Sequence, residues 1–95
     1  MKIKEIYEAM RADGLTSSQM EFSSIWLGRS PRYYSHLIAV DREPGLATLY
    51  GIKWRLEQLR AQSPSVPNPA RLEFQRKLAN EIDRRAIIDI RRHRS

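Results

Sequence analysis

The polar side chains best suited to bind a partner lie on one face of a short helix that we expect at residues 30–40. At about 100° of rotation per helical residue, this face carries four small or polar residues: Arg32, Ser35, His36 and Ala39. The opposite face carries three large apolar residues: Tyr34, Leu37 and Ile38. A turn at Gly28-Arg29 precedes the helix, and Ser30-Pro31 suits its first residues. A short helix with an apolar back and a polar front, directly after a turn, is typical of an element that lies in the major groove of DNA.

Catalysis finds little support in the residue types. There is no cysteine, and the two histidines, His36 and His93, are far apart and lack the spacing of metal ligands. The four glycines form no phosphate-binding loop. We therefore expect no catalytic residue, no metal and no cofactor, and no small-molecule ligand is evident.

The charge of the chain favours polyanions as partners. Seventeen basic and eleven acidic residues give a net charge of +6 over 95 residues, a length that suits one domain. Many small basic proteins bind no nucleic acid, so charge alone leaves the partner open. No apolar run approaches the roughly 18 residues of a membrane span, and the charged N-terminus is unlike a signal peptide. The sequence thus predicts a cytoplasmic protein with no membrane partner.

Hydrophobic periodicity predicts an all-α protein. Helices are expected at 2–13, 17–27, 30–40, 45–61 and 70–92, and no strand pattern is present. Gly14 is expected in the left-handed region at the end of the first helix, and Thr16 and Gln19 fit a capping box at the start of the second. Three prolines mark 62–69 as a linker. This gives a compact four-helix domain at 1–61, the Pro-rich linker at 62–69 and a basic, amphipathic C-terminal helix within 70–95.

The order of these elements resembles the phage-repressor and Cro type of helix-turn-helix domain over about residues 3–60. The residues that carry the resemblance are Gly14-Leu15-Thr16, Gln19, Phe22-Ser23, Trp26-Leu27-Gly28, Ser30, Tyr34, Leu37 and Pro44-Gly45-Leu46-Ala47-Thr48-Leu49. The chain departs from the family at one point. The family usually has alanine where this chain has Ser23, and its turn glycine follows that alanine by four residues, whereas Gly28 follows Ser23 by five. Either the turn is one residue longer here or Ser24 is the small residue.

The resemblance implies that 30–40 is a recognition helix and that double-stranded DNA is the partner. Arg32 is then the best candidate to read a base, because its planar guanidinium can pair with O6 and N7 of guanine. Ser35 and His36 follow on the same face, and His36 either reaches a base or phosphate or is a plain exposed histidine. Tyr33 either contacts a phosphate through its hydroxyl or belongs to the core. The expected phosphate contacts are Ser17, Ser18, Gln19, Arg29, Ser30 and Arg42. Capping alone is the alternative role of the first two serines.

Two apolar surfaces outside this helix predict a homodimer. Along 70–92, apolar residues step by four from position 74 to position 90, a stripe too wide for a solvated helix. This helix could complete the core, pair with its copy or bring its arginines to DNA. The helix at 45–61 has a second apolar face, which could be covered by the same core, by the C-terminal helix or by a partner subunit. The residues expected at a dimer interface are Tyr50, Trp54, Phe74, Leu78, Ile82 and Ile90.

Two classes of function fit these patterns. The leading hypothesis is a sequence-specific DNA-binding transcriptional regulator, such as a repressor, acting as a homodimer on a pseudo-palindromic operator. The alternative is a protein–protein interaction module, such as an antitoxin, an adaptor or an inhibitor, that uses the helices at 45–61 and 70–92. RNA binding is less favoured, because the sequence lacks the usual aromatic sheet or glycine-rich loop.

Overall fold

In the computed structural model, the chain is described at residues 1–62 and 68–94, with side chains up to residue 88. The elements in order are α1 (Ile3–Ala12), α2 (Gln19–Glu21), the π-helix η1 (Phe22–Trp26), α3 (Tyr33–Ala39), α4 (Leu46–Gln62) and α5 (Pro69–Arg94). Within these ranges the chain contains helices and no strand, which confirms the predicted all-α class. Most of the predicted linker, at 63–67, lies outside the described residues.

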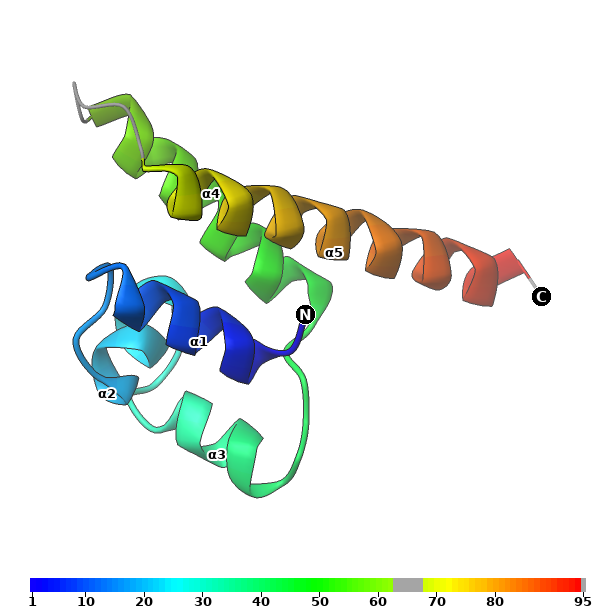
Figure 1. Ribbon diagram of the computed structural model, residues 1–95. Helices are drawn as coiled ribbons and strands as arrows, with labels where there is room; N and C mark the ends of the chain where they lie inside the picture. Colours follow the sequence, from blue (N-terminus) through cyan, green and yellow to red (C-terminus); the bar gives the residue numbers. More distant parts are fainter. Residues whose placement is uncertain (63–67, 95) are drawn as a thin grey trace.

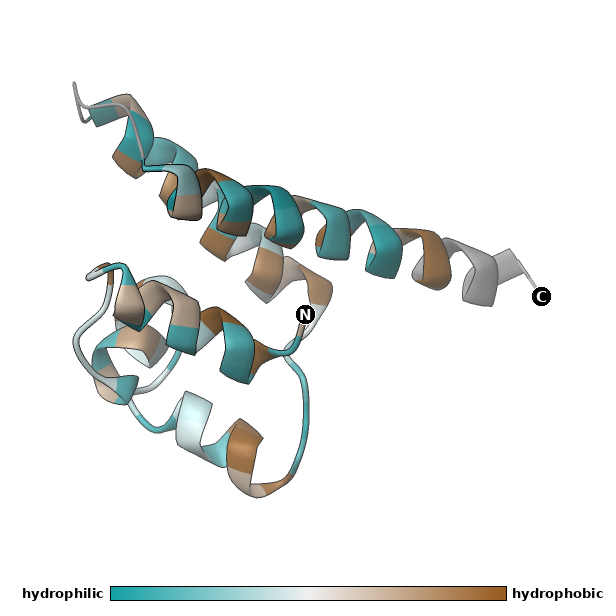
Figure 2. Ribbon diagram, in the orientation of Figure 1, coloured by the Kyte–Doolittle hydropathy of each residue, from teal (hydrophilic) through white to brown (hydrophobic). Residues whose placement is uncertain are grey.

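The N-terminal elements α1, α2, η1 and α3 form one group, and α4 connects that group to α5 (Figure 1). α5 runs back along α4, and its C-terminal end extends past the other helices. Figure 2 shows that most of the visible surface of α5 is hydrophilic, whereas hydrophobic residues recur along α1 and α4. α5 packs along α4, and both helices contribute apolar residues to the same core.

One hydrophobic core joins elements from both ends of the chain. α1 contributes four residues that recur at spacings of three and four along the helix: Ile3, Ile6, Tyr7 and Met10. α4 contributes three: Leu49, Ile52 and Leu56. α5 contributes Phe74, Leu78 and Ile82, which are 7%, 0% and 6% exposed. Of the three roles considered for the C-terminal helix, α5 therefore fulfils the first, because it completes the core of its own chain.

Phe74, Leu78 and Ile82, which the sequence places at a dimer interface, are buried within their own chain. A side chain that already packs within its own chain has little surface left for a second copy. The side chain of Ile90 lies outside the described residues. Tyr50 and Trp54, by contrast, are 56% and 54% exposed, so neither the core nor α5 covers the second apolar face of α4.

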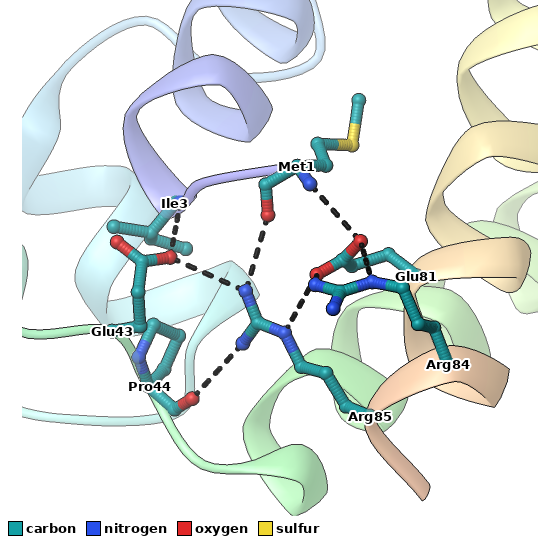
Figure 3. Close-up of polar contacts among 7 residues, drawn as sticks. All are labelled: Met1, Ile3, Glu43, Pro44, Glu81, Arg84 and Arg85. Atoms are coloured by element: carbon teal, nitrogen blue, oxygen red, sulfur yellow. Dashed lines mark hydrogen bonds and ion pairs between the residues drawn. The ribbon is translucent and has the colours of Figure 1, made fainter. Parts of the chain in front are cut away.

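Charged residues tie α5 to the start of α1 and to the loop before α4 (Figure 3). The buried carboxylate of Glu81 accepts hydrogen bonds from Arg84 and, at 2.9 Å, from Nε of Arg85. It also lies 3.0 Å from the amino group of Met1. Arg85 donates further to the main-chain oxygens of Met1, at 3.2 Å, and Pro44, at 3.4 Å. One arginine thus joins three segments that are far apart in the sequence.

Glu43 extends this network to the first turn of α1. Its Oε1 lies 3.5 Å from Arg85 and accepts the main-chain N–H of Ile3 at 2.7 Å, a helix N-terminal donor that has no partner within the helix. The guanidinium of Arg84, with Arg85 and the Met1 amino group, lowers the pKa of Glu81 from 4.5 to about 2. The folded chain therefore favours ionised Glu81 more strongly than the unfolded chain does.

This difference predicts a loss of stability in acid. Because the folded pKa is depressed, the contribution of Glu81 is complete above its ordinary value of 4.5 and disappears as the pH falls toward about 2. Glu81→Gln should lower the free energy of unfolding by about 1–3 kcal/mol at pH 7, and the gap between variant and parent should narrow below pH 4.5. Urea unfolding across this pH range measures both.

Glu73→Gln is the matched control, because Glu73 also pairs with an arginine three residues later but is exposed. An exposed pair of this kind contributes little, so the control should change stability much less at any pH. Equal losses in the two variants, or a Glu81→Gln deficit that does not depend on pH, would contradict the assignment.

Candidate nucleic-acid interface

Ser18, and not Thr16, caps the helix that precedes the turn. Its Oγ accepts the N–H of Glu21 at 3.1 Å. The Glu21 carboxylate in turn accepts the N–H of Ser17 at 3.2 Å and its hydroxyl at 2.6 Å. The Ser17 hydroxyl is the main cause of the lowered pKa of Glu21. Thr16 is buried instead, and its hydroxyl donates to the Ser18 oxygen at 3.3 Å. The predicted capping box is therefore shifted by two residues, and the hydroxyls of Ser17 and Ser18 make capping contacts.

The segment Phe22–Trp26 forms a π-helix, in which each hydrogen bond joins residues five apart, one more than the four of an α-helix. The N–H of Leu27 donates to the oxygen of Phe22 at 3.0 Å, five residues back, and the N–H of Arg29 donates to the oxygen of Ser23 at 3.0 Å. Ser23 is fully buried and Ser24 is exposed. The extra residue before Gly28 thus lies within the helix, and Ser23 is the small residue.

The hydroxyl of Ser23 connects the two helices on either side of the turn. It donates to the main-chain oxygen of Gln19 at 2.9 Å and accepts the main-chain N–H of Tyr34 at 3.0 Å. The Tyr34 N–H lies in the first turn of α3, where the helix itself supplies no acceptor. A side chain of one helix therefore caps the next and fixes the position of α3.

Three aromatic rings support the buried side of α3. The rings of Tyr7, Phe22 and Tyr34 lie 4.8 to 5.4 Å apart between centroids, and the two contacts to Phe22 are edge-on. Edge-to-face aromatic pairs add about 0.5–1.5 kcal/mol each beyond burial alone. Burial also raises the pKa of the Tyr34 hydroxyl. Leu37 completes this side, whereas Ile38, predicted to share it, is 44% exposed.

Arg55 fixes the turn from the other side, a role that the sequence does not predict. Its Nη1 donates to the main-chain oxygen of Trp26 at 3.0 Å, at the C-terminal end of the π-helix. Gly28 has φ +65°, and a Cβ at this position would lie 3.0 Å from Nη2 of Arg55. A cation at a helix C-terminus stabilises the exposed carbonyls there. The glycine therefore suits this position chiefly through its backbone conformation, and a side chain here would also crowd the Arg55 guanidinium.

The structure leaves almost all of the predicted contact residues exposed. Tyr33 is half-buried, and the exposed residues are Ser17, Ser18, Gln19, Arg29, Ser30, Arg32, Ser35, His36 and Arg42. Arg32 is the N-cap residue of α3 and does not lie inside the helix, because residues 31–32 form a turn. The hydroxyl of Ser35 donates to Oε1 of Gln19 at 3.2 Å. The polar face of α3 and the start of α2 thus form one continuous surface.

Two of the predicted phosphate contacts have defined surroundings. The guanidinium carbon of Arg29 lies 5.5 Å from the centroid of the Tyr33 ring, a cation–π arrangement that holds both side chains. Arg42 follows Asp41, which has φ 52°, and its N–H closes the end of α3 by donating to the oxygen of Leu37 at 2.9 Å. A left-handed residue after the last helical turn is a common helix end, and aspartate tolerates it better than most residues.

A shallow hollow beside Gln19 adds basic residues from α1. It has a volume of about 580 Å³ and is lined by Lys4, Tyr7, Glu8, Arg11, Ala12, Gln19 and Tyr34. The sequence shows Lys4, Glu8 and Arg11 only as the polar face of an amphipathic helix. Their position next to α2 depends on how α1 packs, which periodicity does not predict.

The charge of this surface is modest. Between residues 17 and 42, three arginines stand against Glu21 and Asp41. Across the part of the chain that the structure describes, no group of three or more His, Cys, Asp or Glu residues could hold a metal ion. No helix in the same part is long and apolar enough to cross a membrane. The arrangement offers hydrogen-bonding groups and a few cations on an exposed helix face.

The fold and this surface define a helical protein in the part of the chain that the structure describes. One of its helices has an exposed polar face, and an aromatic cluster packs behind that helix. The chain belongs to a family of unknown function, DUF6626, whose model matches residues 3–91. No curated protein and no solved structure matches the chain. The family match takes in α1 through most of α5, so the C-terminal helix is part of the unit that defines the family.

The two hydrogen bonds of Ser23 predict a large difference between adjacent serines. Ser23→Ala removes the acceptor of a buried N–H, which should lower the free energy of unfolding by about 1–3 kcal/mol. Ser24→Ala, at an exposed position one residue later, should change it by less than about 0.5 kcal/mol. Urea unfolding followed by circular dichroism compares the two, and similar values for both would remove Ser23 from its proposed role.

Proposed function

We propose that the protein is a sequence-specific DNA-binding regulator of transcription that inserts α3 into a major groove and acts as a homodimer on a pseudo-palindromic operator. The observation that carries the proposal is the exposed face of α3. Ser35 and His36 on α3, with Arg32 directly before it, lie beside Gln19 and are exposed, while Ser23 and the aromatic cluster hold the opposite side. A helix that is to read bases must present its polar side outward on a rigid support.

The π-helix supports the resemblance to the phage-repressor and Cro type of helix-turn-helix. The sequence has one residue too many between Ser23 and Gly28 for that family. Because η1 absorbs this residue before the turn, Gly28 can still occupy the left-handed position at which the chain reverses toward α3. A net charge of +6 favours a polyanionic partner as well.

The roles of individual residues follow from their positions. Arg32 would read guanine with its planar guanidinium, and Ser35 and His36 would contact neighbouring base edges. Gln19, oriented by its hydrogen bond from Ser35, would link base and backbone contacts. The expected phosphate contacts are Arg29, Ser30, Arg42 and, from the hollow on α1, Lys4 and Arg11.

The small number of cations explains why a dimer is needed. A copy that neutralises about four phosphates, through Arg29, Arg42, Lys4 and Arg11, gives a slope of about −3.6 when the logarithm of affinity is plotted against that of salt concentration. Such a copy alone binds weakly at physiological salt. Two linked copies on two half-sites add their contacts, and the two-fold symmetry of the pair predicts a palindromic site.

Replacing Arg32 tests the base-reading role. With a site selected in vitro from random DNA, Arg32→Ala should weaken binding by about 10- to 100-fold and relax the preference at one guanine in each half-site. The fold should persist, because Arg32 is exposed. Arg60→Ala, near the end of α4 and away from α3, is the control and should bind as the parent does. Fluorescence anisotropy measures affinity; unchanged affinity and unchanged base preference in Arg32→Ala would exclude the role.

Arg29 should behave differently from Arg32, because it is assigned to a phosphate. Arg29→Ala should weaken binding to all DNA sequences alike and, because each copy of the dimer loses one phosphate contact, reduce the magnitude of the salt slope by about 2. Anisotropy titrations at several salt concentrations give the slope. A loss confined to the selected sequence would instead place Arg29 at a base.

A protein–protein interaction module remains the second candidate, favoured by the exposure of Tyr50 and Trp54 on α4. Selection from random DNA separates the two. A module of this kind would enrich no DNA sequence, whereas a regulator would enrich one with two related halves.

A further inference from the structure

The outer face of α4 has a helix-pairing pattern that the chain itself does not use. Residues at alternating spacings of three and four lie along one stripe of a helix. On α4 this stripe is formed by Ala47, Tyr50, Trp54, Glu57 and Ala61, which we call the outer stripe, and all five are exposed. Tyr50 and Trp54 at its centre are 56% and 54% exposed, an unusual exposure for two neighbouring aromatic residues on a small protein.

We propose that the outer stripe pairs with the same stripe of a second copy of this chain, antiparallel and centred on Trp54. The stripe is nearly symmetric about that residue. Ala47 and Ala61 lie seven residues to either side, so each small residue would face the small residue of the other copy. An interface between identical surfaces must be self-complementary about a two-fold axis, and this pattern meets that requirement.

Charge favours the antiparallel orientation. In a parallel pair, Glu57 would face the partner's Glu57, and like charges directly opposite each other are unfavourable. In the antiparallel pair centred on Trp54, Glu57 faces the partner's Gly51, and the two carboxylates lie roughly 9 Å apart along the helices at 1.5 Å per residue. Tyr50 would face the partner's Gln58, a side chain that can both donate to and accept from a phenol.

The charges beside the stripe argue against a polyanion as the occupant. Nζ of Lys53 lies 2.8 Å from Glu57, and Arg55 donates to the main-chain oxygen of Trp26. Both cations thus have partners within the chain. Beside Trp54 the face continues into a groove of about 380 Å³, lined by Ile25, Trp26, Trp54, Arg55, Gln58, Leu59 and Gln62, which leaves room for a second helix to lie against the tryptophan.

The available area sets the strength of the pairing. A fully exposed aromatic residue has roughly 200 Å² of accessible surface. Tyr50 and Trp54 are each about half exposed, so together they offer roughly 200 Å² to a partner. Ile25 and Leu59, which are 58% and 37% exposed, add to this area. A standard stable interface uses about 800 Å² per partner. The pair should therefore dissociate on dilution. This inference deepens the proposed function, because a weak dimer in solution would be strengthened on two adjoining half-sites.

Sedimentation of the full chain over a wide concentration range, without DNA, tests the pairing independently of DNA binding. The parent should pass from monomer to dimer, and Trp54→Ala and Tyr50→Ala should each shift the midpoint at least about tenfold toward higher concentration, the effect of truncating a central aromatic contact. Ile87→Ala is the matched control, because Ile87 is 51% exposed on α5 and should leave the midpoint unchanged. Circular dichroism confirms that each variant is folded.

The absence of cysteine from the chain allows a test of the register. Ala47→Cys mixed with Ala61→Cys should form a disulfide-linked dimer, while either variant alone should form far less, since the pairing places position 47 opposite position 61 of the partner. A chain that stays monomeric throughout, a dimer that Ile87→Ala weakens and Trp54→Ala does not, or equal cross-linking in the single variants would overturn the proposal. Failure to select any DNA sequence would overturn the proposed function and leave this result standing.

Discussion

The position of α3 depends on one hydroxyl group. Ser23 is buried, and its oxygen donates to Gln19 in its own helical segment and accepts from the first turn of α3. Helices as short as α2 and α3 are not stable alone, because nucleation costs more than a few hydrogen bonds return. They persist here because the Ser23 hydroxyl satisfies a backbone oxygen of α2 and a backbone N–H of α3. The hydroxyl thus forms a direct bond across the turn.

The helices and most core residues follow from the sequence, and the local details of the turn do not. Periodicity predicts the core face of α1 and the burial of Tyr34 and Leu37, and Gly14 has the expected positive φ. The cap is different, because three successive residues, Thr16, Ser17 and Ser18, are all good candidates, and small energies decide among them. The π-helix is different too. One additional residue can be accommodated either within a helix, as a π-helical turn, or in the loop that follows. Only the packing around Ser23 and Gly28 decides which of the two forms.

The role of α5 depends on contacts that sequence patterns cannot supply. An apolar stripe stepping by four indicates that something covers the helix, but the core of the same chain and a partner subunit would both produce the same stripe. The deciding contacts run between residues about 40 to 80 positions apart, such as Arg85 with Glu43 and Glu81 with the Met1 amino group. The same contacts hold the loop that follows α3. α5 therefore stabilises the exposed surface of α3 from a distance, although it contributes no residue to it.

The packing of α5 also decides where a second copy can bind. A helix with two apolar faces can satisfy one against its own core, as α4 does with Leu49, Ile52 and Leu56. If α5 paired with its copy through Phe74, Leu78 and Ile82, it would have to leave α4, and both helices would expose the core. With α5 in place, a second copy can cover the outer stripe of α4 while the core stays buried. Within the described side chains, then, dimerisation through α4 is compatible with a folded monomer, whereas dimerisation through the buried stripe of α5 is not.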